Sequence, residues 1–390
     1  MPTVNLGPWP LGIDNISEAS NLMKGACLDA INGVIRRGGH FQRRFNETQI
    51  SSTPMDSIWQ SPDGPTYAAV DGVLSRLNWS AGLVTTPLFP LPSYDPLSYT
   101  TVNDTAIFAS MAVLGSIVGD VVTLLGVELP GAFAIAPSAA GGLDEGRYGV
   151  AISYVAGNEE GGLSDVQFVD VVAGGGLQFT LPTPLEARVT MIRLYRTPCN
   201  GDQLYRALDV PLMPSALVGT DTLTIAASTQ YKDRMLGGSY IREWRGRLVV
   251  ARGHTLLFSE PMNYGLRDAR HGFLQMPERI TFVEPLDTGM YVGTTKKVYW
   301  LAGTTPKDLA VKIVELVPAV GGASLVMPVA DTGLDAKFEN CAVWLGANGY
   351  SFGMPSGDVV RPVSSIFRIE TLDMTGKLAL INGVLTTVLQ

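Results

Sequence analysis

The chain has 390 residues, of which 46% are apolar and only 16% are charged, and its formal net charge is −8. This length exceeds what one hydrophobic core normally supports, so we expect two domains or one large repeat architecture. The apolar content excludes a disordered protein, and the acidic balance argues against a protein that grips nucleic acid by neutralising phosphates. With so few charges, much of the surface is expected to face other subunits.

The amino-terminal third opens without a basic stretch followed by an apolar one, so no signal peptide is expected. Residues 20–30 are the best candidate for a short helix, although Gly25 interrupts them. Four arginines then surround Gly38 and Gly39 and form either a subunit interface or a nucleic-acid surface: Arg36, Arg37, Arg43 and Arg44. The most apolar stretch, residues 107–129, is broken by glycine, serine and Asp120, which indicates buried strands and not a membrane span.

A unit of two apolar runs joined by a tight polar or glycine turn recurs along the chain. Asp-Gly and Asn-Gly favour such turns because both central residues need a positive φ. The five units cover residues 67–79, 247–258, 290–301, 341–352 and 378–388. Their spacing predicts an all-β fold, a β-propeller-like repeat of hairpins, with a series of β-sandwiches as the alternative.

The middle segment, residues 141–238, has a different pattern. Six or seven short alternating strands in this length predict an inserted fibronectin- or immunoglobulin-like β-sandwich. We therefore expect residues 1–140 and 239–390 to form the two parts of one propeller. Residues 101–190 hold ten acids and two bases, which is either a solvated face or a surface that repels DNA; the candidates for the latter are Asp144, Glu145, Glu159, Glu160 and Asp165.

The segment from Arg242 to Arg279 combines seven arginines with aromatic residues. This composition suits a subunit interface, which we favour, or a nucleic-acid surface. The candidate interface residues are Arg242, Trp244, Arg245, Arg247, Arg252, Arg267 and Arg270.

Motifs of catalysis and metal binding are missing from the sequence. The three cysteines and three histidines show no ligand spacing, and no nucleophile elbow or phosphate-binding loop is present. Propellers can host glycosidases, but the spacing of Glu284, Asp287, Asp331, Asp335 and Asp358 singles out no pair. We therefore expect no enzyme, no cofactor and no metal.

Three blocks resemble tail nozzle proteins (tail tubular protein B type) of short-tailed bacteriophages. The first is GIDN at residues 12–15 with KGACLDAINGV at 24–34 and the four arginines around Gly38 and Gly39, for which the resemblance implies a structural hairpin. The second is RYGVAISYVAGNEEGGLS at 147–164, continued by IRLYRT at 192–197 and LYR at 204–206. The third is WRGRLVVARGHTLLFSEP at 244–261, followed by KKVYWLAG at 296–303.

The resemblance implies a homo-oligomeric ring, six-fold in those proteins, at the distal end of a phage tail. Its partners would be copies of itself, the tail adaptor or tube, fibre proteins, and DNA that passes without specific binding. The protein would be made in the host cytoplasm and reside in the virion. Two alternatives stay open: a head-completion hub that stabilises packaged DNA, and a propeller lectin or glycan-processing protein that recognises the host.

Overall fold

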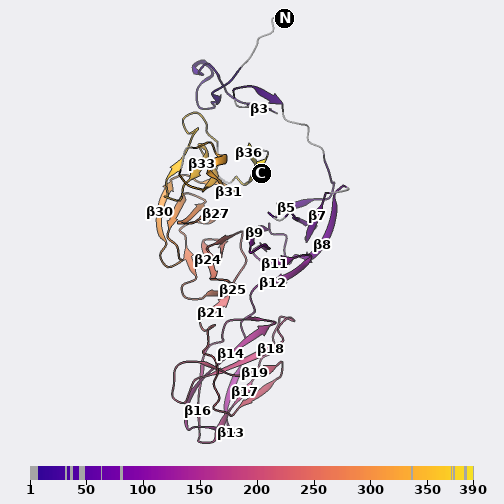
Figure 1. The fold of residues 1–390 in the computed structure, drawn as a ribbon, viewed down its shortest axis with the longest axis vertical. Coiled ribbons are helices and arrows are strands. Elements are labelled where there is room, and N and C mark those ends of the chain that lie inside the picture. Colours follow the sequence, from indigo (N-terminus) through magenta and orange to yellow (C-terminus); the bar gives the residue numbers. More distant parts are fainter. Residues whose placement is uncertain are drawn as a thin grey trace.

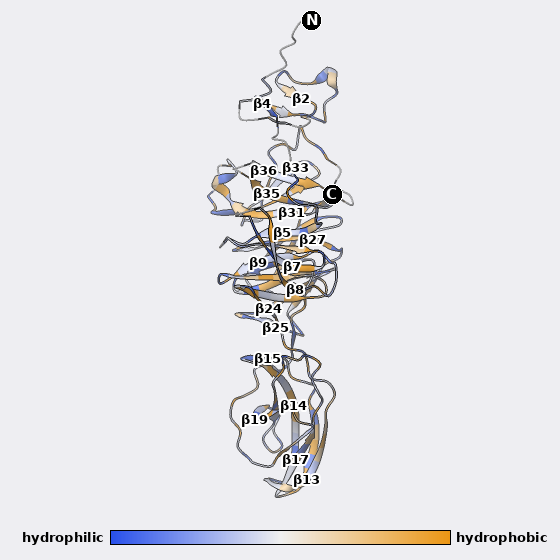
Figure 2. Ribbon diagram, turned by 90° about the vertical axis from the view of Figure 1, so that its right-hand side faces the viewer, coloured by the Kyte–Doolittle hydropathy of each residue, from blue (hydrophilic) through white to orange (hydrophobic). Residues whose placement is uncertain are grey.

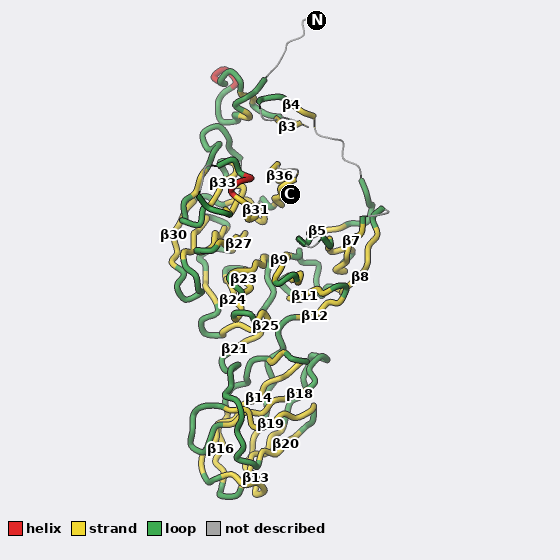
Figure 3. Tube along the Cα trace, in the orientation of Figure 1, coloured by secondary structure: helices red, strands yellow, loops and turns green. Residues whose placement is uncertain are grey.

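The computed structural model describes residues 8–30, 33–35, 38–43, 49–62, 64–79, 82–334, 337–369, 371, 374–381 and 384–389. Three parts follow one another along its length: a small amino-terminal segment, a ring of β-sheets and a protruding sandwich (Figures 1 and 2). Nearly all regular structure in the described residues is strand; the two helical turns are 3-10 turns, η1 (Ala19–Asn21) and η2 (Val329–Asp331) (Figure 3).

The ring is built from antiparallel sheets that follow one another as propeller blades, and the all-β, propeller-like prediction is confirmed. Within the described residues, five sheets of the ring have at least four strands. Blade 1 is β5 (Met55–Gln60), β6 (Thr66–Val70), β7 (Val73–Asn78) and β8 (Val84–Pro90). Blade 2 is β9 (Ser98–Val102), β10 (Thr105–Ala109), β11 (Leu114–Val118) and β12 (Val121–Leu124).

The other three large blades follow the sandwich in sequence. Blade 3 is β22 (Tyr240–Trp244), β23 (Arg247–Arg252), β24 (Thr255–Glu260) and β25 (Asn263–Asp268), with β21 (Lys232–Arg234) and β26 (Phe273–Gln275) added. Blade 4 is β27 (Ile280–Leu286), β28 (Gly289–Thr294), β29 (Val298–Ala302) and β30 (Ala310–Glu315). Blade 5 is β31 (Ala319–Pro328), β32 (Asn340–Gly346), β33 (Gly349–Gly353) and β34 (Val359–Val360).

The ring's core lies between the faces of neighbouring blades. Leu74 of blade 1 packs with Phe108 of blade 2, while Ile107 on the other face of blade 2 packs with Val250 of blade 3. Further round, the indole of Trp344 in blade 5 lies 5.0 Å from the ring of Tyr291 in blade 4. Each middle strand is therefore apolar on both faces, which explains why the hairpin pattern was visible in the sequence.

A last hairpin, β35 (Gly376–Ile381) and β36 (Val384–Leu389), follows blade 5. Leu378 and Leu385 of this hairpin pack against the core of blade 5. The predicted hairpin over residues 378–388 is thus present, although its turn, Asn382 and Gly383, lies outside the described residues. The hairpin therefore lies beside blade 5.

The inserted segment folds as two sheets around one buried core that includes Tyr148, Phe179 and Leu194. One sheet is β13 (Ala134–Leu143), β17 (Gly175–Thr180) and β20 (Ser215–Val218). The other is β14 (Gly146–Ala156), β15 (Glu159–Glu160), β16 (Gln167–Val171), β18 (Met191–Arg196) and β19 (Tyr205–Pro211). The first strand of this segment, β13, starts before the expected boundary at 141. The last, β20, ends at Val218, well before 238, because the chain has returned to blade 3 by β21. The sandwich projects outward from the rim of the ring (Figures 1 and 2).

The amino-terminal segment contains two small sheets: β1 (Gly12–Ile13) with β2 (Ala26–Cys27), and β3 (Gly33–Ile35) with β4 (Phe41–Arg43). The predicted helix over residues 20–30 was wrong, because only one 3-10 turn forms before Gly25, whose φ is +96°, and β2 follows at once. The predicted arginine hairpin corresponds to β3 and β4, but Arg36, Arg37 and Arg44 lie outside the described residues.

Candidate functional site

The ring axis carries a cluster of charged residues, the axial cluster, contributed by the innermost strands. Its centre is Glu284 of β27, only 1% exposed, which accepts two hydrogen bonds from the guanidinium of Arg242 in β22, at 2.7 and 3.1 Å. The hydroxyl of Ser324 in β31 donates a third at 2.8 Å. Burial alone would lower the pKa of Arg242, but the charge of Glu284 outweighs it and raises that pKa. The pair therefore ties blades 3, 4 and 5 together at the axis.

Lys377 of β35 also belongs to the axial cluster. Lys377 is exposed, but its partial desolvation beside the inner strands lowers its pKa; Arg242 lowers that pKa further, while Asp56 of β5 acts in the opposite direction. Because strands from both ends of the ring bring their charges together here, the axis is a polar, electrostatically coupled region.

Two adjoining cavities of about 340 and 360 Å³ lie beside the axial cluster. Both are bordered by Glu243, Pro285 and Val326. The smaller one also reaches Thr101, whose hydroxyl is buried without a hydrogen-bond partner. These cavities could accept a small polar ligand that supplies such a partner.

The other predicted interface arginines are largely engaged within the chain. The guanidinium of Arg252 donates to the carbonyls of Met111 and Gly237, both at 2.7 Å, and joins blade 3 to blade 2. Arg247 donates to the carbonyl of Ser259 at 2.7 Å, and Arg267 pairs with Asp233. These contacts stabilise the ring itself, so the arginine-rich composition reflects bonding between strands and blades.

Three members of the predicted interface set remain. Trp244 is 2% exposed, lies in the core with Phe258 and donates its indole N–H to the carbonyl of Leu286 at 3.1 Å. It leaves no surface for a partner. Arg245 and Arg270 are exposed, and the Arg270 guanidinium stacks 3.9 Å from the ring centroid of Tyr231.

The predicted acidic, DNA-repelling residues are not gathered at the ring axis, because they lie in the sandwich that projects from the rim. Asp144, Glu145 and Asp165 are exposed there. Glu160 accepts hydrogen bonds from Ser153 at 2.7 Å and Tyr195 at 2.6 Å and is paired with Arg193. The sequence showed an excess of acids in this part of the chain. It did not show that an arginine further along, Arg193, neutralises Glu160.

Glu159 belongs to a junction that we call the neck, where the sandwich joins the ring. Its carboxylate accepts from the backbone N–H of Gly126 at 2.9 Å and pairs with Arg188 at 3.2 Å. Arg188 also donates to the carbonyl of Leu124, the last residue of blade 2, at 2.9 Å. Glu186 pairs with Arg188 and with Arg234 of blade 3. The neck is therefore an ion-pair network that fixes the sandwich to two blades.

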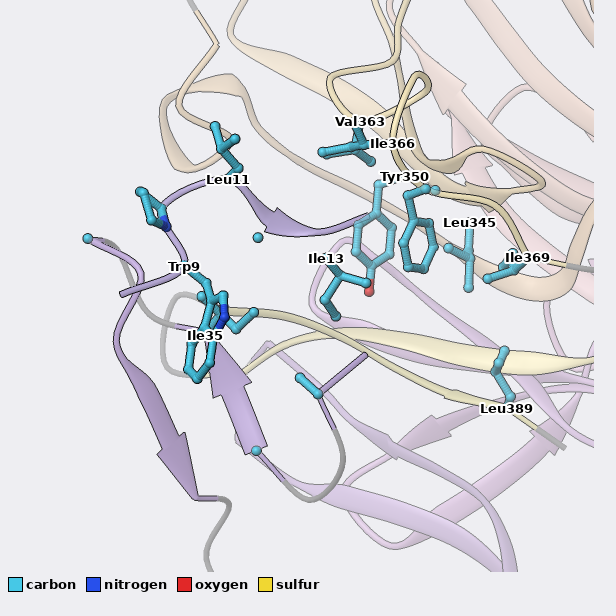
Figure 4. A pocket seen from close by; sticks show the side chains of 17 residues that line it. Trp9, Leu11, Ile13, Ile35, Leu345, Tyr350, Val363, Ile366, Ile369 and Leu389 are labelled. Atoms are coloured by element: carbon cyan, nitrogen blue, oxygen red, sulfur yellow. The ribbon is translucent and has the colours of Figure 1, made fainter. Parts of the chain in front are cut away.

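An apolar cleft of about 720 Å³ lies between the amino-terminal segment and blade 5 (Figure 4). One side is formed by Trp9, Leu11 and Ile13, together with Ile35 of β3. The other side is formed by side chains of blade 5, the loop after it and β36, including Leu345, Tyr350, Val363, Ile366 and Leu389. The sequence analysis missed this surface, because its two sides come from opposite ends of the chain.

The segment that borders the cleft is fixed to the loop after blade 5 by a reciprocal pair of hydrogen bonds. The side-chain amide of Asn15 donates to the carbonyl of Arg368 at 2.7 Å, and the N–H of Arg368 donates back to the side-chain oxygen of Asn15 at 2.8 Å. The backbone N–H of Asn15 also donates to the carbonyl of Ile366 at 3.0 Å.

Among the described residues, no three His, Cys, Asp or Glu side chains are grouped so that they could hold a metal ion. Of the carboxylates considered for glycoside hydrolysis, Glu284 is engaged with Arg242, and Asp358 accepts from the Ser356 hydroxyl at 2.8 Å. Asp335 lies outside the described residues. No helix in the described part of the chain is long and apolar enough to cross a membrane.

Comparison with known proteins gives a likeness in structure only. No family model matches the chain, and no curated protein matches it. Virginiamycin B lyase from Staphylococcus aureus is similar at 10% identity, with a TM-score of 0.34 over 84% of this chain and 89% of that one. YCF48 from Cyanidioschyzon merolae is similar at 8% identity, with a TM-score of 0.32 over 85% of this chain and 90% of that one.

These matches correct one expectation. The sequence predicted that the chain is not an enzyme, and that prediction is contradicted, because the structures that it resembles include a lyase. At these TM-scores the likeness carries no argument for a particular reaction.

Proposed function

We propose that the chain is a subunit of a larger protein assembly, and the observation that carries this proposal is its surface area. The accessible surface is 20548 Å² for 41.6 kDa. A compact monomer of this mass exposes about 15,000 Å². The excess of roughly 5,500 Å², much of it on the protruding sandwich and amino-terminal segment, is comparable with the area that permanent subunit interfaces bury.

Exposed apolar side chains occur in all three parts of the molecule, which supports contacts along its whole length. The amino-terminal segment exposes Met23 and Phe41, the outer strands of the blades expose Val121, and the sandwich exposes Phe168 and Leu185. The carboxyl-terminal hairpin adds four more: Leu380, Ile381, Val388 and Leu389. Scattered apolar residues are ordinary on monomers, but their presence together with the excess surface favours assembly.

We further propose that this assembly is a ring in the tail of a short-tailed bacteriophage. The support is the resemblance of three sequence blocks to tail nozzle proteins, in their order along the chain. The partners would be further copies, the adaptor or tube of the tail, fibre proteins and passing DNA, and the location would be the virion. A head-completion hub that stabilises packaged DNA is the alternative within the virion.

Size-exclusion chromatography with light scattering tests the assembly over a concentration series, and electron microscopy then shows any ring. We expect a concentration-dependent species of several chains. A protein that stays monomeric at every concentration would refute the proposal. Mass spectrometry of purified virions tests the phage assignment, and absence of the chain from virions would remove it.

A second candidate function is favoured by the axial cavities, namely recognition of a polar ligand such as a host glycan. The unpartnered hydroxyl of Thr101 and the charged side chain of Glu243 border them. Calorimetric titration with host polysaccharide fragments tests this function, with Glu243→Gln as the variant. Binding that survives this substitution unchanged would place the ligand elsewhere.

A further inference from the structure

The ring contains an incomplete sixth blade. Each of the five large blades has four or more strands, whereas β35 and β36 form a sheet of two among the described residues. An isolated two-stranded sheet is only marginally stable in water, so such a hairpin normally adds further strands or packs on a neighbour.

The position of this hairpin is that of a blade. β35 lies beside β31 in the same way that β31 lies beside β27, and Gly321 and Thr375 form a parallel bridge at the start of that contact. Lys377 of β35 is close enough to Arg242 and Asp56 for their charges to shift its pKa. β35 is therefore the innermost strand of blade 6, and β36 is the second.

One face of the hairpin packs on blade 5 through Leu378 and Leu385. On the opposite face Ile381 is 53% exposed and Val388 60%. Leu389 lies on the face toward blade 5 and borders the apolar cleft. On the neighbouring blade 1, Ile58 is also exposed. A sheet that lacks its outer strands and presents apolar side chains is the arrangement that β-strand addition uses.

The chain holds a second two-stranded sheet, β3 with β4, in the amino-terminal segment. Two strands from this hairpin and two from β35 and β36 would make a four-stranded blade. In one chain, however, the two hairpins lie on opposite sides of the apolar cleft, with Ile35 and Leu389 on its two walls (Figure 4). The β3–β4 hairpin is tied to its side by Trp9, whose N–H donates to Gly39 at 2.8 Å, and the segment is anchored through Asn15 and Arg368.

We propose that the β3–β4 hairpin of a second copy enters the apolar cleft, adds to β36 and completes blade 6. The contact joins two different surfaces, so each copy offers one hairpin and accepts another. Repetition of such a contact produces a closed ring or a filament. This inference rests on the proposed function, since it names the surface through which the assembly forms.

Cross-linking of proteins that carry one exposed cysteine each tests the proposal, in a background in which Cys27 and Cys199 are serine and the buried Cys341 remains. One protein carries Arg43→Cys in β4, and the other carries Val388→Cys in β36. We expect a short bismaleimide to give a covalent dimer in the mixture and none with either protein alone. Replacing Val388→Cys by Val118→Cys, on an exposed strand of blade 2, serves as the matched control and should give no dimer.

The outcomes separate the inference from the function on which it rests. If the proteins assemble by light scattering but give no cross-link with Arg43→Cys or with a second probe, Phe41→Cys, the inference fails and the assembly stands. A cross-link formed only inside one chain that carries both cysteines would mean that each copy closes its own blade, which also overturns the inference. Monomers at every concentration would overturn both.

A charge substitution gives an independent measurement. Leu389→Asp would bury an unpaired carboxylate in the contact, so we expect the dissociation constant of the assembly to rise at least about tenfold. Val118→Asp, at an exposed apolar position on blade 2, is the control and should leave the constant unchanged. Equal effects of both variants would contradict the proposed surface.

Discussion

Removing the guanidinium from the axial cluster should destabilise the ring far more than a surface substitution does. In Arg242→Met, Glu284 keeps only the hydrogen bond from Ser324, while its side chain stays 1% exposed. Breaking a buried ion pair from one side costs about 3–5 kcal/mol, because the remaining charge is left without a partner. We expect a loss of that size in the free energy of unfolding, measured by urea titration with tryptophan fluorescence.

The double variant Arg242→Met with Glu284→Met separates two contributions to the free energy of unfolding. One is the loss caused by a buried carboxylate without a partner, and the other is the stabilisation from the ion pair itself. Apolar side chains of similar volume can replace a buried ion pair with little loss, so the double variant should recover most of the stability. Arg247→Met is the matched control, since this arginine donates to a carbonyl and has no carboxylate partner in the described structure. A single variant within about 1 kcal/mol of the parent, or a double variant as unstable as the single, would refute the reasoning.

Three further predictions concern other parts of the chain. Burial alone would raise the pKa of Asp268, but the backbone N–H groups of residues 270 and 271 and the charge of Lys232 outweigh it and bring that pKa to about 2. The resulting stabilisation is present above about pH 4 and is lost as the pH falls toward 2. Asp268→Asn should therefore lower the free energy of unfolding by about 2 kcal/mol at neutral pH and weaken its fall with decreasing pH, measured by urea titrations at a series of pH values. An unchanged fall at low pH would contradict this. Burial raises the pKa of the Cys341 thiol to about 11, so Cys341 should react with Ellman's reagent only after unfolding, and labelling of the native protein would show that blade 5 opens. Arg188→Ala should loosen the neck and speed hydrogen exchange at residues 124–131, whereas Arg147→Ala, which removes an exposed cation stacked on an aromatic ring, should not; equal exchange in both would exclude the neck network as the fixing element.

Blades 1, 3 and 5 could be predicted because their hairpin turns carry glycine. Asp71 and Gly72 have φ of 48° and 74°, the conformation that a two-residue hairpin turn requires, and β6 and β7 follow from them. Blade 2 escaped because its corresponding turn is Asn103 and Asp104, at φ of 46° and 60°. Asn and Asp can adopt a left-handed conformation, but they also occur widely outside such turns, so they predict the turn less clearly than glycine does.

The surfaces were harder to predict than the strands. Composition around Trp244 and the arginines suggested an interface, but their partners are carbonyls and carboxylates of neighbouring blades, which only the folded ring brings close. The neutralisation of Glu160 by Arg193 depends in the same way on pairing between distant strands. Patterns of period two report which side chains are buried, but they hold no information on which distant strand covers them.

The reciprocal bonds between Asn15 and Arg368 join residues that are 353 positions apart. During synthesis they can form only after residue 368 has left the ribosome, whereas each blade needs only local sequence. The amino-terminal segment is therefore the first part to be made and among the last to be fixed in place, after all five large blades have emerged. A chain cut before residue 368 would lack this anchor.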